Sequence, residues 1–402
     1  MGTEMLTRAT FKRLFSQSLS SQAFNLLGVL AGAILATLSV YTSLNPWILV
    51  LVPPLLTVRG NVGGILCGRL STSLYLGLVK PTLRKNTSYY YATMASTFVM
   101  SFIFSIVIGA FSFLVVNATQ GGQLSLTDSL FLSTIAMMIC TTLTLFITSS
   151  VAVVSYRRGV NPEVILYPIL STMNDIMMCA TYTLLVVAYM SWSWGFAALS
   201  LTLFPVFAAT TVYLTLKYWR EEAFRETFKE GFPVALLLTF LSQITGSFLS
   251  QLEDQISAYP QILAIYPLLI DGTGDVGVII SSSTTARLAL GYMEPQMSSI
   301  KREEGRKVAL SSLTAGLTMM LGATLAASIT YTPSILQVAR SFSVIACAEL
   351  LIAAPVIVLA SFGLTILTFR RGINPDNVTI PIITSFADML VTISIFLTSR
   401  IL

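Results

Sequence analysis

The fold follows from a stretch of sequence that occurs twice. Residues 53–81 read PPLLTVRGNVGGILCGRLSTSLYLGLVKP, and residues 267–295 read PLLIDGTGDVGVIISSSTTARLALGYMEP. A second pair of motifs lies further along at nearly the same offset. Residues 156–175 read YRRGVNPEVILYPILSTMND, and residues 369–388 read FRRGINPDNVTIPIITSFAD. Two motifs that recur together in the same order indicate an internal repeat that covers most of the chain.

The composition is that of a membrane protein. The chain has 402 residues, of which 54% are hydrophobic and 10% charged, whereas an ordinary soluble domain is about 25% charged. This excludes a soluble enzyme, a nucleic-acid module and a disordered protein. There is no histidine, so the commonest general base and transition-metal ligand is missing. The four cysteines lie in apolar runs without C-x-x-C spacing, which favours small buried hydrophobes over a disulfide or zinc frame.

Apolar runs long enough to cross a bilayer, about 20 residues each, occur along the whole chain. We predict eleven membrane-spanning helices at about 20–43, 46–76, 90–117, 125–155, 162–190, 194–217, 233–252, 260–292, 308–330, 333–368 and 377–400. The second and the eighth contain the glycine-rich segments GNVGG and DGTGDVG. Such segments predict broken or kinked helices, which are tolerated at membrane depth only where protein or a water-filled cavity satisfies the backbone.

The basic residues mark one side of the membrane. Most of the 23 Lys and Arg precede the first span or follow the second, fourth, sixth, eighth and tenth spans. The opposite loops, 41–45, 118–124, 191–193, 253–259 and 331–332, contain neither residue. Cytoplasmic loops carry the Lys and Arg excess, so we expect the N-terminus inside and the C-terminus outside. The net charge of +5 therefore reflects topology and not a nucleic-acid partner.

We therefore expect an all-α polytopic membrane protein built from two parallel five-helix repeats. Residues 1–19 form a cytoplasmic or interfacial lead-in, 20–190 the first repeat, 191–222 a linker helix and 223–402 the second repeat. A repeat with an odd number of spans is inverted in its next copy, and the linker helix restores the orientation. The repeats are then related by an axis along the membrane normal, where a pore or a shared ion site is expected. This internal pseudo-dimer would suffice as a monomer.

Two acidic residues within the spans are equivalent in the two repeats, Asp175 and Asp388. Each follows a hydroxyl residue by four positions, Ser171 or Thr384, on the same helix face. Two neighbouring carboxylates repel each other unless a cation lies between them. Oxygen ligands without His or Cys suit Mg²⁺ or Ca²⁺. The alternative is that each Asp pairs with an arginine within or near the spans, although these are not repeat-symmetric: Arg59, Arg69, Arg287 and Arg340.

Further polar residues are candidate pore-lining or supporting groups. Asn61 and Asp275 are equivalent and follow Gly60 and Gly274 in the glycine-rich segments. Two interpretations of these segments stay open. Either a break in the helix frees backbone carbonyls that coordinate a cation, or the glycines allow close helix packing. Asn174 precedes Asp175 and is a supporting residue. Asp271 and Glu349 are one-sided charges, equivalent to Thr57 and Ala136, which favours local salt bridges over a shared ligand.

The segment GNVGGILCGRLST resembles the GN-x7-RLST segment of solute carrier family 41, and INPDNVTIPIITSFAD resembles that family's DPDN-x3-P-x5-GD signature. Both also resemble the membrane domain of MgtE magnesium channels and transporters. This resemblance implies two fused five-span domains and places Asp175 and Asp388 at a Mg²⁺ site in the fifth helix of each repeat. The departures are NPEV at 161–164, Asn374 in the leading Asp position, and Ser283 in place of the RLST arginine. We expect no soluble CBS domains beside these repeats.

We therefore expect transport of a divalent cation, most simply Mg²⁺, along the pseudo-two-fold interface, with the paired Asp residues holding a hydrated or partly hydrated ion. The alternatives are Na⁺- or H⁺-coupled exchange of a divalent cation and an intramembrane aspartyl enzyme. The expected partners are the lipid bilayer and the ion itself. We expect no nucleic acid, no enzymatic activity and no cofactor besides Mg²⁺ as the bound or transported ion. The expected location is the plasma membrane, as a multi-pass protein.

Overall fold

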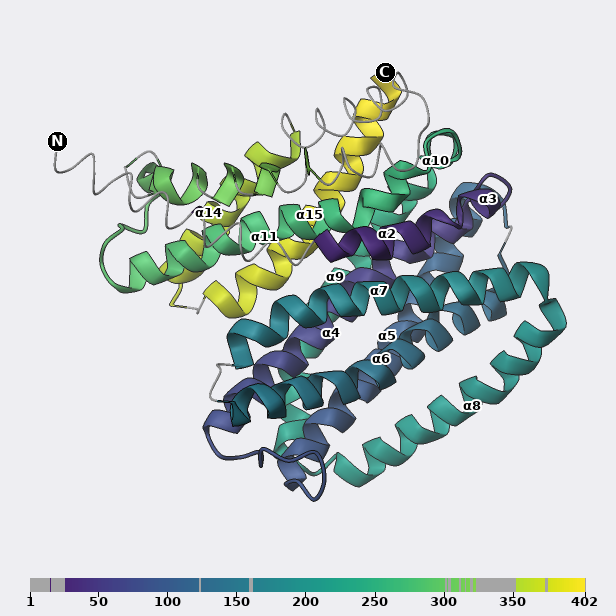
Figure 1. Cartoon of the computed structure of the whole chain (residues 1–402), viewed down its shortest axis with the longest axis horizontal. Helices are drawn as coiled ribbons and strands as arrows, with labels where there is room; N and C mark the ends of the chain where they lie inside the picture. Colours follow the sequence, from purple (N-terminus) through teal and green to yellow (C-terminus); the bar gives the residue numbers. More distant parts are fainter. Residues whose placement is uncertain are drawn as a thin grey trace. The chain divides into compact units, whose positions relative to one another are not determined.

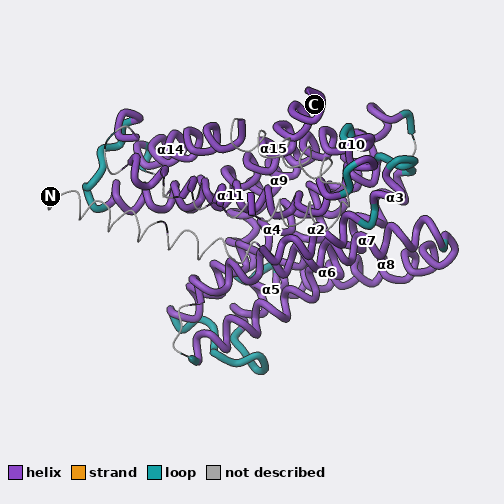
Figure 2. Tube along the Cα trace, turned by 45° about the horizontal axis from the view of Figure 1, so that its top comes forward, coloured by secondary structure: helices purple, strands orange, loops and turns teal. Residues whose placement is uncertain are grey.

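The computed structural model describes residues 15, 26–122, 124–158, 162–300, 302, 305–310, 312–314, 316–318, 321–322, 352–372 and 375–401. These residues form helices and connecting loops without strands (Figure 2). The helices, labelled in Figure 1, are α2 (Gly28–Ala36), α3 (Ser39–Thr42), α4 (Trp47–Tyr75), α5 (Ser88–Gln120), α6 (Leu126–Arg157), α7 (Pro162–Ser191), α8 (Ser193–Tyr218), α9 (Glu222–Ser250), α10 (Glu253–Ala258), α11 (Gln261–Ala289), η2 (Met297–Ile300), α14 (Ala354–Arg370) and α15 (Pro375–Ile401).

Within this described part, 8 helices are long and apolar enough to cross a membrane: α4, α5, α6, α7, α8, α9, α11 and α15. The prediction of an all-α polytopic membrane protein is therefore confirmed at the level of its class. The boundaries agree closely with the predicted spans except at α9. That helix begins at Glu222, well before the apolar run at 233. The predicted spans at 20–43, 308–330 and 333–368 lie partly outside the described residues.

The glycine-rich segments do not break their helices. α4 is continuous through GNVGG and α11 is continuous through DGTGDVG. Of the predicted broken or kinked helices, the break is therefore wrong, and the kink stays a prediction. A glycine within a helix costs about 0.5–1 kcal/mol relative to alanine, and close packing offsets that cost. A Cβ added to Gly63 would lie 2.9 Å from Nη1 of Arg59, and one added to Gly277 would lie 2.4 Å from Cγ2 of Ile383. Gly63 and Gly277 therefore serve close packing.

The chain folds into two compact units. The α4 unit comprises residues 37–253, and the α11 unit comprises residues 1–36 and 254–402. Each unit contains the second to fifth predicted spans of one repeat. The first helix of each repeat belongs to the unit of the other repeat. Helix α9, from the second repeat, lies in the α4 unit, and helix α2, from the first repeat, lies in the α11 unit. The compact units thus differ from the contiguous repeats by the exchange of one helix.

The exchanged helices pack in the same way in both units. A Cβ on Gly32 of α2 would lie 1.7 Å from the backbone oxygen of Ala264 on α11. A Cβ on Gly246 of α9 would lie 2.2 Å from the backbone oxygen of Val50 on α4. The two contacts are equivalent in the repeat. Gly32 corresponds to Gly246 and Val50 corresponds to Ala264, each at the offset of 214 residues. Glycine at these positions lets two helix backbones approach closely, as is usual in membrane helix packing.

The conformations and hydrogen bonds at the helix ends also occur in both repeats. α4 and α11 are followed by Gly77 and Gly291, with φ of +72° and +74°, a left-handed conformation that favours glycine. The Arg157 guanidinium then donates a hydrogen bond to the carbonyl of Pro81 at 2.6 Å. In the second repeat the Arg370 guanidinium donates to the carbonyl of Pro295. The repeat inferred from the motifs is therefore a repeat of backbone structure.

The linker helix α8 is the most exposed of the long helices of the α4 unit. Only 11% of its most apolar window is buried, compared with 72% for α4. It runs along α5, α6 and α7 at the edge of this unit (Figure 1). Exposed tryptophans stand at its two ends, Trp192, Trp194 and Trp219, which is typical of the two interfaces of a bilayer. This is the arrangement expected of a helix that faces lipid.

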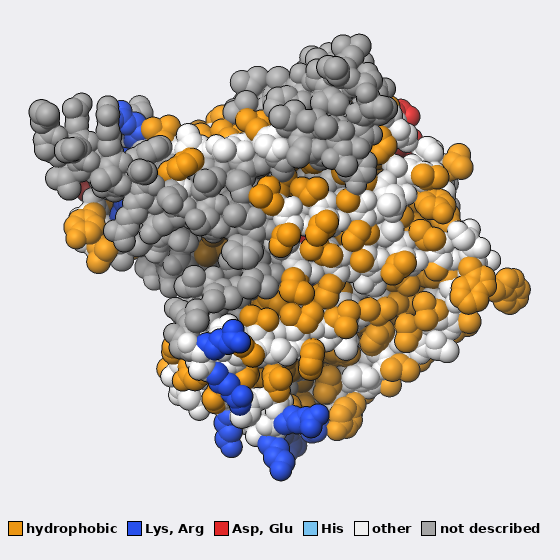
Figure 3. All heavy atoms as spheres, in the orientation of Figure 1, with side chains coloured by type: hydrophobic (Ala, Val, Ile, Leu, Met, Phe, Trp, Pro, Cys, Tyr) orange, Lys and Arg blue, Asp and Glu red, His pale blue; other side chains and the backbone are white. Residues whose placement is uncertain are grey.

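The surface of the α4 unit separates apolar from basic side chains. In Figure 3 hydrophobic side chains cover the visible face of α6, α7 and α8, while Lys and Arg side chains gather at one end. That end carries the ends of α4, α6 and α8, the loops after them and the start of α9, with these basic residues: Lys80, Arg84, Lys85, Arg157, Arg158, Lys217, Arg220 and Arg225. An apolar flank with a basic rim is the surface expected of a protein in a bilayer.

Candidate cation site

Asp175 lies in the buried part of α7. Its relative exposure is 7%, and its neighbours Asn174 and Thr172 are each 2% exposed. Helix α7 packs against α4 and α6 within the α4 unit, and its predicted start is marked by Pro162, whose fixed φ suits the first helical turn. The candidate carboxylate therefore stands inside the helix bundle of this unit. Ser171, one turn earlier, is partly buried.

A buried arginine lies beside this segment of α7. Arg59 of α4 is 1% exposed. Its Nη2 donates a hydrogen bond to Oδ1 of Asn174 at 2.8 Å, and its Nε donates to Sγ of Cys140 at 3.3 Å. The Thr144 hydroxyl donates to the same Asn174 oxygen at 2.7 Å. We refer to Arg59, Cys140, Thr144 and Asn174 as the arginine cluster; it joins α4, α6 and α7.

The glycine motif makes room for the arginine cluster. A Cβ added to Gly63 would lie 2.9 Å from Nη1 of Arg59 and 3.1 Å from Nδ2 of Asn174. The guanidinium thus occupies the place where a side chain at position 63 would stand. Asn174, predicted as a supporting residue, uses its Oδ1 to hold Arg59. Asn174 immediately precedes Asp175 on α7.

Asn61 has an unsatisfied oxygen. Its Oδ1 is buried and has no hydrogen-bond partner among the residues that the structure describes. A Cβ added to the preceding Gly60 would meet no described atom within 4 Å. A buried amide oxygen without a partner is costly, so it is a suitable ligand for a cation or its hydration water. Of the predicted supporting residues, Asn61 is the one with this property.

Threonines on α6 add a polar stripe that the sequence analysis did not single out. Thr141, Thr144 and Thr148 are each at most 2% exposed and lie three to four residues apart, on one face of the helix. The hydroxyls of Thr141 and Thr148 have no hydrogen-bond partner within the described ranges. The spacing of these threonines, three and four residues apart, was the available signal in the sequence.

Asp388 occupies the equivalent position on α15 in the α11 unit. It is partly buried, and its carbonyl accepts a hydrogen bond from the Thr392 hydroxyl at 2.7 Å. Thr392 in turn bonds with the hydroxyl of Tyr266 on α11 at 2.8 Å. Thr384 bonds back to carbonyls of its own helix, and Gly274 lies against it, since an added Cβ would stand 3.7 Å from Cα of Thr384. The structure therefore brings Gly274 and Thr384 together.

The positions equivalent to the arginine cluster are occupied by different residue types in the second repeat. The repeat equivalents of the arginine cluster are Thr273, Ala353, Ile357 and Ala387. All four are buried, and Ile357 and Ala387 belong to a hydrophobic cluster with Val276, Ile280, Phe362 and Ile383. The second repeat thus keeps the candidate carboxylate but has Thr273 and three buried apolar residues in place of the arginine cluster.

The remaining predicted acids have different positions. Asp271 and Asp275 lie one turn apart on α11, and both are partly buried. Glu349 and Arg340 lie outside the described residues. Within the described ranges no three His, Cys, Asp or Glu side chains converge on a point where they could hold a metal ion.

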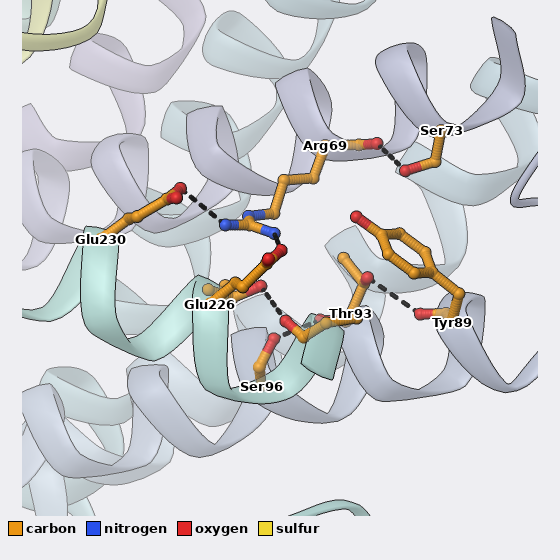
Figure 4. A network of polar contacts seen from close by, with 9 residues as sticks. Arg69, Ser73, Tyr89, Thr93, Ser96, Glu226 and Glu230 are labelled. Carbon is orange, nitrogen blue, oxygen red and sulfur yellow. Dashed lines mark hydrogen bonds and ion pairs between the residues drawn. The ribbon is translucent and has the colours of Figure 1, made fainter. Parts of the chain in front are cut away.

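The arginine of the RLST segment has a structural contact. Arg69 of α4 forms ion pairs with Glu230 at 2.7 Å and Glu226 at 3.6 Å, both on the exchanged helix α9 (Figure 4). The side chains of Glu226 and Glu230 are 49% and 72% exposed. Ser73, one turn further, bonds to the carbonyl of Arg69. This arginine therefore links α4 to α9 near the basic end of the unit.

The comparison with protein families gives one match, found twice. The model of the MgtE family, described as divalent cation transporters, matches residues 52–185 and residues 266–398. The two matches begin 214 residues apart and end 213 residues apart, which reproduces the offsets of the motifs. They include the arginine cluster, both candidate Asp residues and both glycine-rich segments. No curated protein and no solved structure gives a significant match to the chain.

Proposed function

Because this chain belongs to the MgtE family of divalent cation transporters, we propose that it carries Mg²⁺ across the membrane with Asp175 and Asp388 as the carboxylate ligands. The family is one of transporters, so the intramembrane enzyme is set aside. The observation that carries the proposal is the buried carboxylate of Asp175 in an apolar helix, repeated in sequence at Asp388. A charge at membrane depth costs about 2.5–3.5 kcal/mol on insertion scales, and such residues mark ion pathways.

The chemistry of the surroundings supports Mg²⁺ or another hard cation. The oxygen-bearing side chains of α7 and of the facing part of α6 are the carboxylate of Asp175, the amide of Asn174 and the hydroxyl of Thr144, and α4 adds the unsatisfied Asn61 oxygen. Mg²⁺ prefers oxygen ligands and keeps several of its waters. A pathway with few protein ligands therefore suits a hydrated or partly hydrated ion. We propose that the path follows the axis that relates the two repeats.

The proposed topology has eleven spans, with the N-terminus inside and the C-terminus outside. It is supported by the basic residues at one end of the α4 unit and by the equivalent basic ends of α14 and α11. The plasma membrane and a monomeric state belong to the same proposal. An impermeant thiol reagent applied to single cysteines at positions 86 and 121 tests the orientation. Position 121 should react from outside and position 86 only after permeabilisation; the reverse pattern contradicts the proposal.

The test of function is ion flux in proteoliposomes under controlled gradients. D175N and D388N should each lower Mg²⁺ flux at least tenfold, because each removes a proposed ligand charge. D254N, in the short helix α10, is the matched control because it removes an exposed carboxylate, and its flux should equal that of the unmodified protein. Unchanged flux in both ligand variants contradicts the site assignment.

The same vesicles distinguish passive conduction from coupled exchange. Flux is measured with and without an opposing Na⁺ or pH gradient, at fixed membrane potential. A passive path predicts no dependence on either gradient. Acceleration by one gradient identifies the Na⁺- or H⁺-coupled exchanger that the sequence left open.

A further inference from the structure

The first repeat has a buried guanidinium near its candidate ligand, Arg59, where the second repeat has the neutral Thr273. We propose that Arg59 is a tethered cation that weakens divalent-cation binding on the Asp175 side, so that Asp388 is the principal ligand of the transported ion. This inference rests on the proposed function, because it concerns the same site. It makes the two halves of the protein chemically unequal.

The charge of Arg59 is permanent and is not cancelled by contact with a carboxylate. A guanidinium stays protonated at any pH a protein experiences. Its hydrogen bonds go to an amide oxygen and a thiol sulfur, which provide dipoles but no compensating charge. Arg69 forms ion pairs, whereas in the described part of the chain Arg59 forms none.

The position of the charge is fixed. Asn174 and Cys140 hold two nitrogens of the guanidinium, and Gly63 leaves the volume that the third nitrogen fills. The side chain is 1% exposed, so water screens its field only weakly. A fixed charge in a medium of low dielectric acts over a longer range than an exposed one.

The cluster is tied to the candidate ligand through the chain itself. Asn174, which receives the guanidinium hydrogen bond, immediately precedes Asp175 on α7. The positive field of Arg59 therefore reaches the neighbourhood of the Asp175 carboxylate and opposes a second cation there. Coulomb repulsion is proportional to the charge of the incoming ion, so Mg²⁺ feels twice the effect that Na⁺ feels.

The second repeat has no such charge at the equivalent place. Thr273 replaces Arg59, and Ala387 replaces the asparagine that would hold it. Ile357 fills the position of Thr144 and is fully buried. The field that opposes a divalent cation at Asp175 is therefore absent from the equivalent cluster beside Asp388.

A purely structural role for Arg59 is the competing explanation, since its bonds join three helices. The two roles differ in ion dependence. A structural role predicts that R59Q changes stability and total flux but leaves the preference for Mg²⁺ over Na⁺ as it was. The charge role predicts that the preference changes, because the divalent ion responds more strongly.

The experiment measures binding of Mg²⁺ and of Na⁺ to the full-length protein in detergent by calorimetry, together with Mg²⁺ flux in proteoliposomes. R59Q should tighten Mg²⁺ binding about tenfold and Na⁺ binding about threefold, the ratio expected from their charges. R59K keeps the charge and should stay close to the unmodified Mg²⁺:Na⁺ preference. N174D places a carboxylate against the unmodified Arg59 and should reproduce the gain of R59Q. A preference unchanged in both R59Q and N174D overturns the inference.

A second test compares D388N with D175N and leaves the arginine cluster unchanged. D388N should weaken Mg²⁺ binding at least tenfold more than D175N does. Equal losses in these two variants overturn the inference even if R59Q and N174D fail to fold. If the unmodified protein neither binds nor transports Mg²⁺, the proposed function itself fails, which is a different result from the failure of this inference alone.

Discussion

The segment of α7 around Asp175 and the segment of α15 around Asp388 are repeat equivalents with different surroundings. The first lies beside a buried arginine held by an amide and a thiol; the second lies beside buried alanine and isoleucine. The scaffold around them is the same, since the glycine contacts of the exchanged helices and the arginine bonds to proline carbonyls occur in both repeats. The repeat has therefore kept its backbone contacts while the polar chemistry next to the carboxylates diverged. Variants that affect the shared scaffold should act alike in the two halves, and variants of the arginine cluster should not.

The largest effect is expected where two helix backbones meet. G32A and G246A each place a Cβ less than 2.5 Å from a backbone oxygen of the partner helix, so the helices must separate. Each should cost more than about 3 kcal/mol of stability, the upper range for overpacking, and by similar amounts. Thermal unfolding of the purified protein in detergent measures this.

The matched control for these variants is G60A, where the added Cβ meets no described atom within 4 Å. It should be neutral or stabilising by up to about 1 kcal/mol, the usual gain for alanine over glycine in a helix. If G32A and G246A differ strongly from each other, the two exchanged helices are not equivalent in energy.

The next effect concerns the arginine cluster and should be one-sided. N174A removes the oxygen that accepts from Arg59 and leaves a buried charge with one fewer partner, at a cost of about 1.5–3 kcal/mol. The double variant R59T/N174A, which copies the residue types of the second repeat, should be less destabilised than N174A alone, because no buried charge remains. A double-mutant cycle in thermal unfolding measures this coupling. Additive losses would show that Asn174 does not serve Arg59.

A smaller, symmetric effect is expected at the helix ends. R157A and R370A each remove a guanidinium that donates to a proline carbonyl, at a cost of about 0.5–1.5 kcal/mol for one hydrogen bond. Proteolysis of the loops at 81–87 and 295–300 measures the loosening, with R158A as the control on a neighbouring exposed arginine. If the variant's loop is cleaved no faster than the loop of the unmodified protein, the arginine hydrogen bond does not hold that loop in place.

The smallest effect is expected for R69S, which introduces the serine found at the equivalent position 283. Arg69 pairs with exposed glutamates, and exposed ion pairs contribute about 0.2–1 kcal/mol. The loss should shrink further in 1 M salt, where the screening length is about 3 Å. Melting temperatures at low and high salt check this. A salt-independent loss would mean that packing of the arginine stem, and not its charge, is what matters.

Sequence patterns predicted the helices and the repeat because both depend on local composition. The limits of α4, α5, α6 and α7 follow from apolar length and from capping residues such as Thr87 and Ser125. The predicted span at 233–252 begins later than α9 because the first turns of α9 are charged. Hydropathy identifies the part of a helix that lies within the membrane and does not identify a charged helical turn outside it. The exchange of first helices was not predictable, because an apolar face does not identify its partner.

The candidate site was predictable only in part, for a similar reason. The repeat alignment selected Asp175 and Asp388 and showed that Arg59 has no equivalent. It gave no information on what the guanidinium contacts. The roles of Cys140 and Thr144 depend on contacts between helices that lie far apart in sequence. The glycine segments were predicted to break their helices because glycine occurs both in irregular backbone and where two elements pack closely.

The exchange of α2 and α9 has a consequence for biogenesis. Helix α2 leaves the ribosome long before the helix it packs on, α11, which is made only after residue 260. During synthesis α2 must therefore wait in the bilayer or at the translocon without its final neighbour, while the α4 unit completes itself as soon as α9 arrives. Neither repeat expressed alone contains all the helices of a compact unit, so two half-length chains should reach the folded state only when they are produced together.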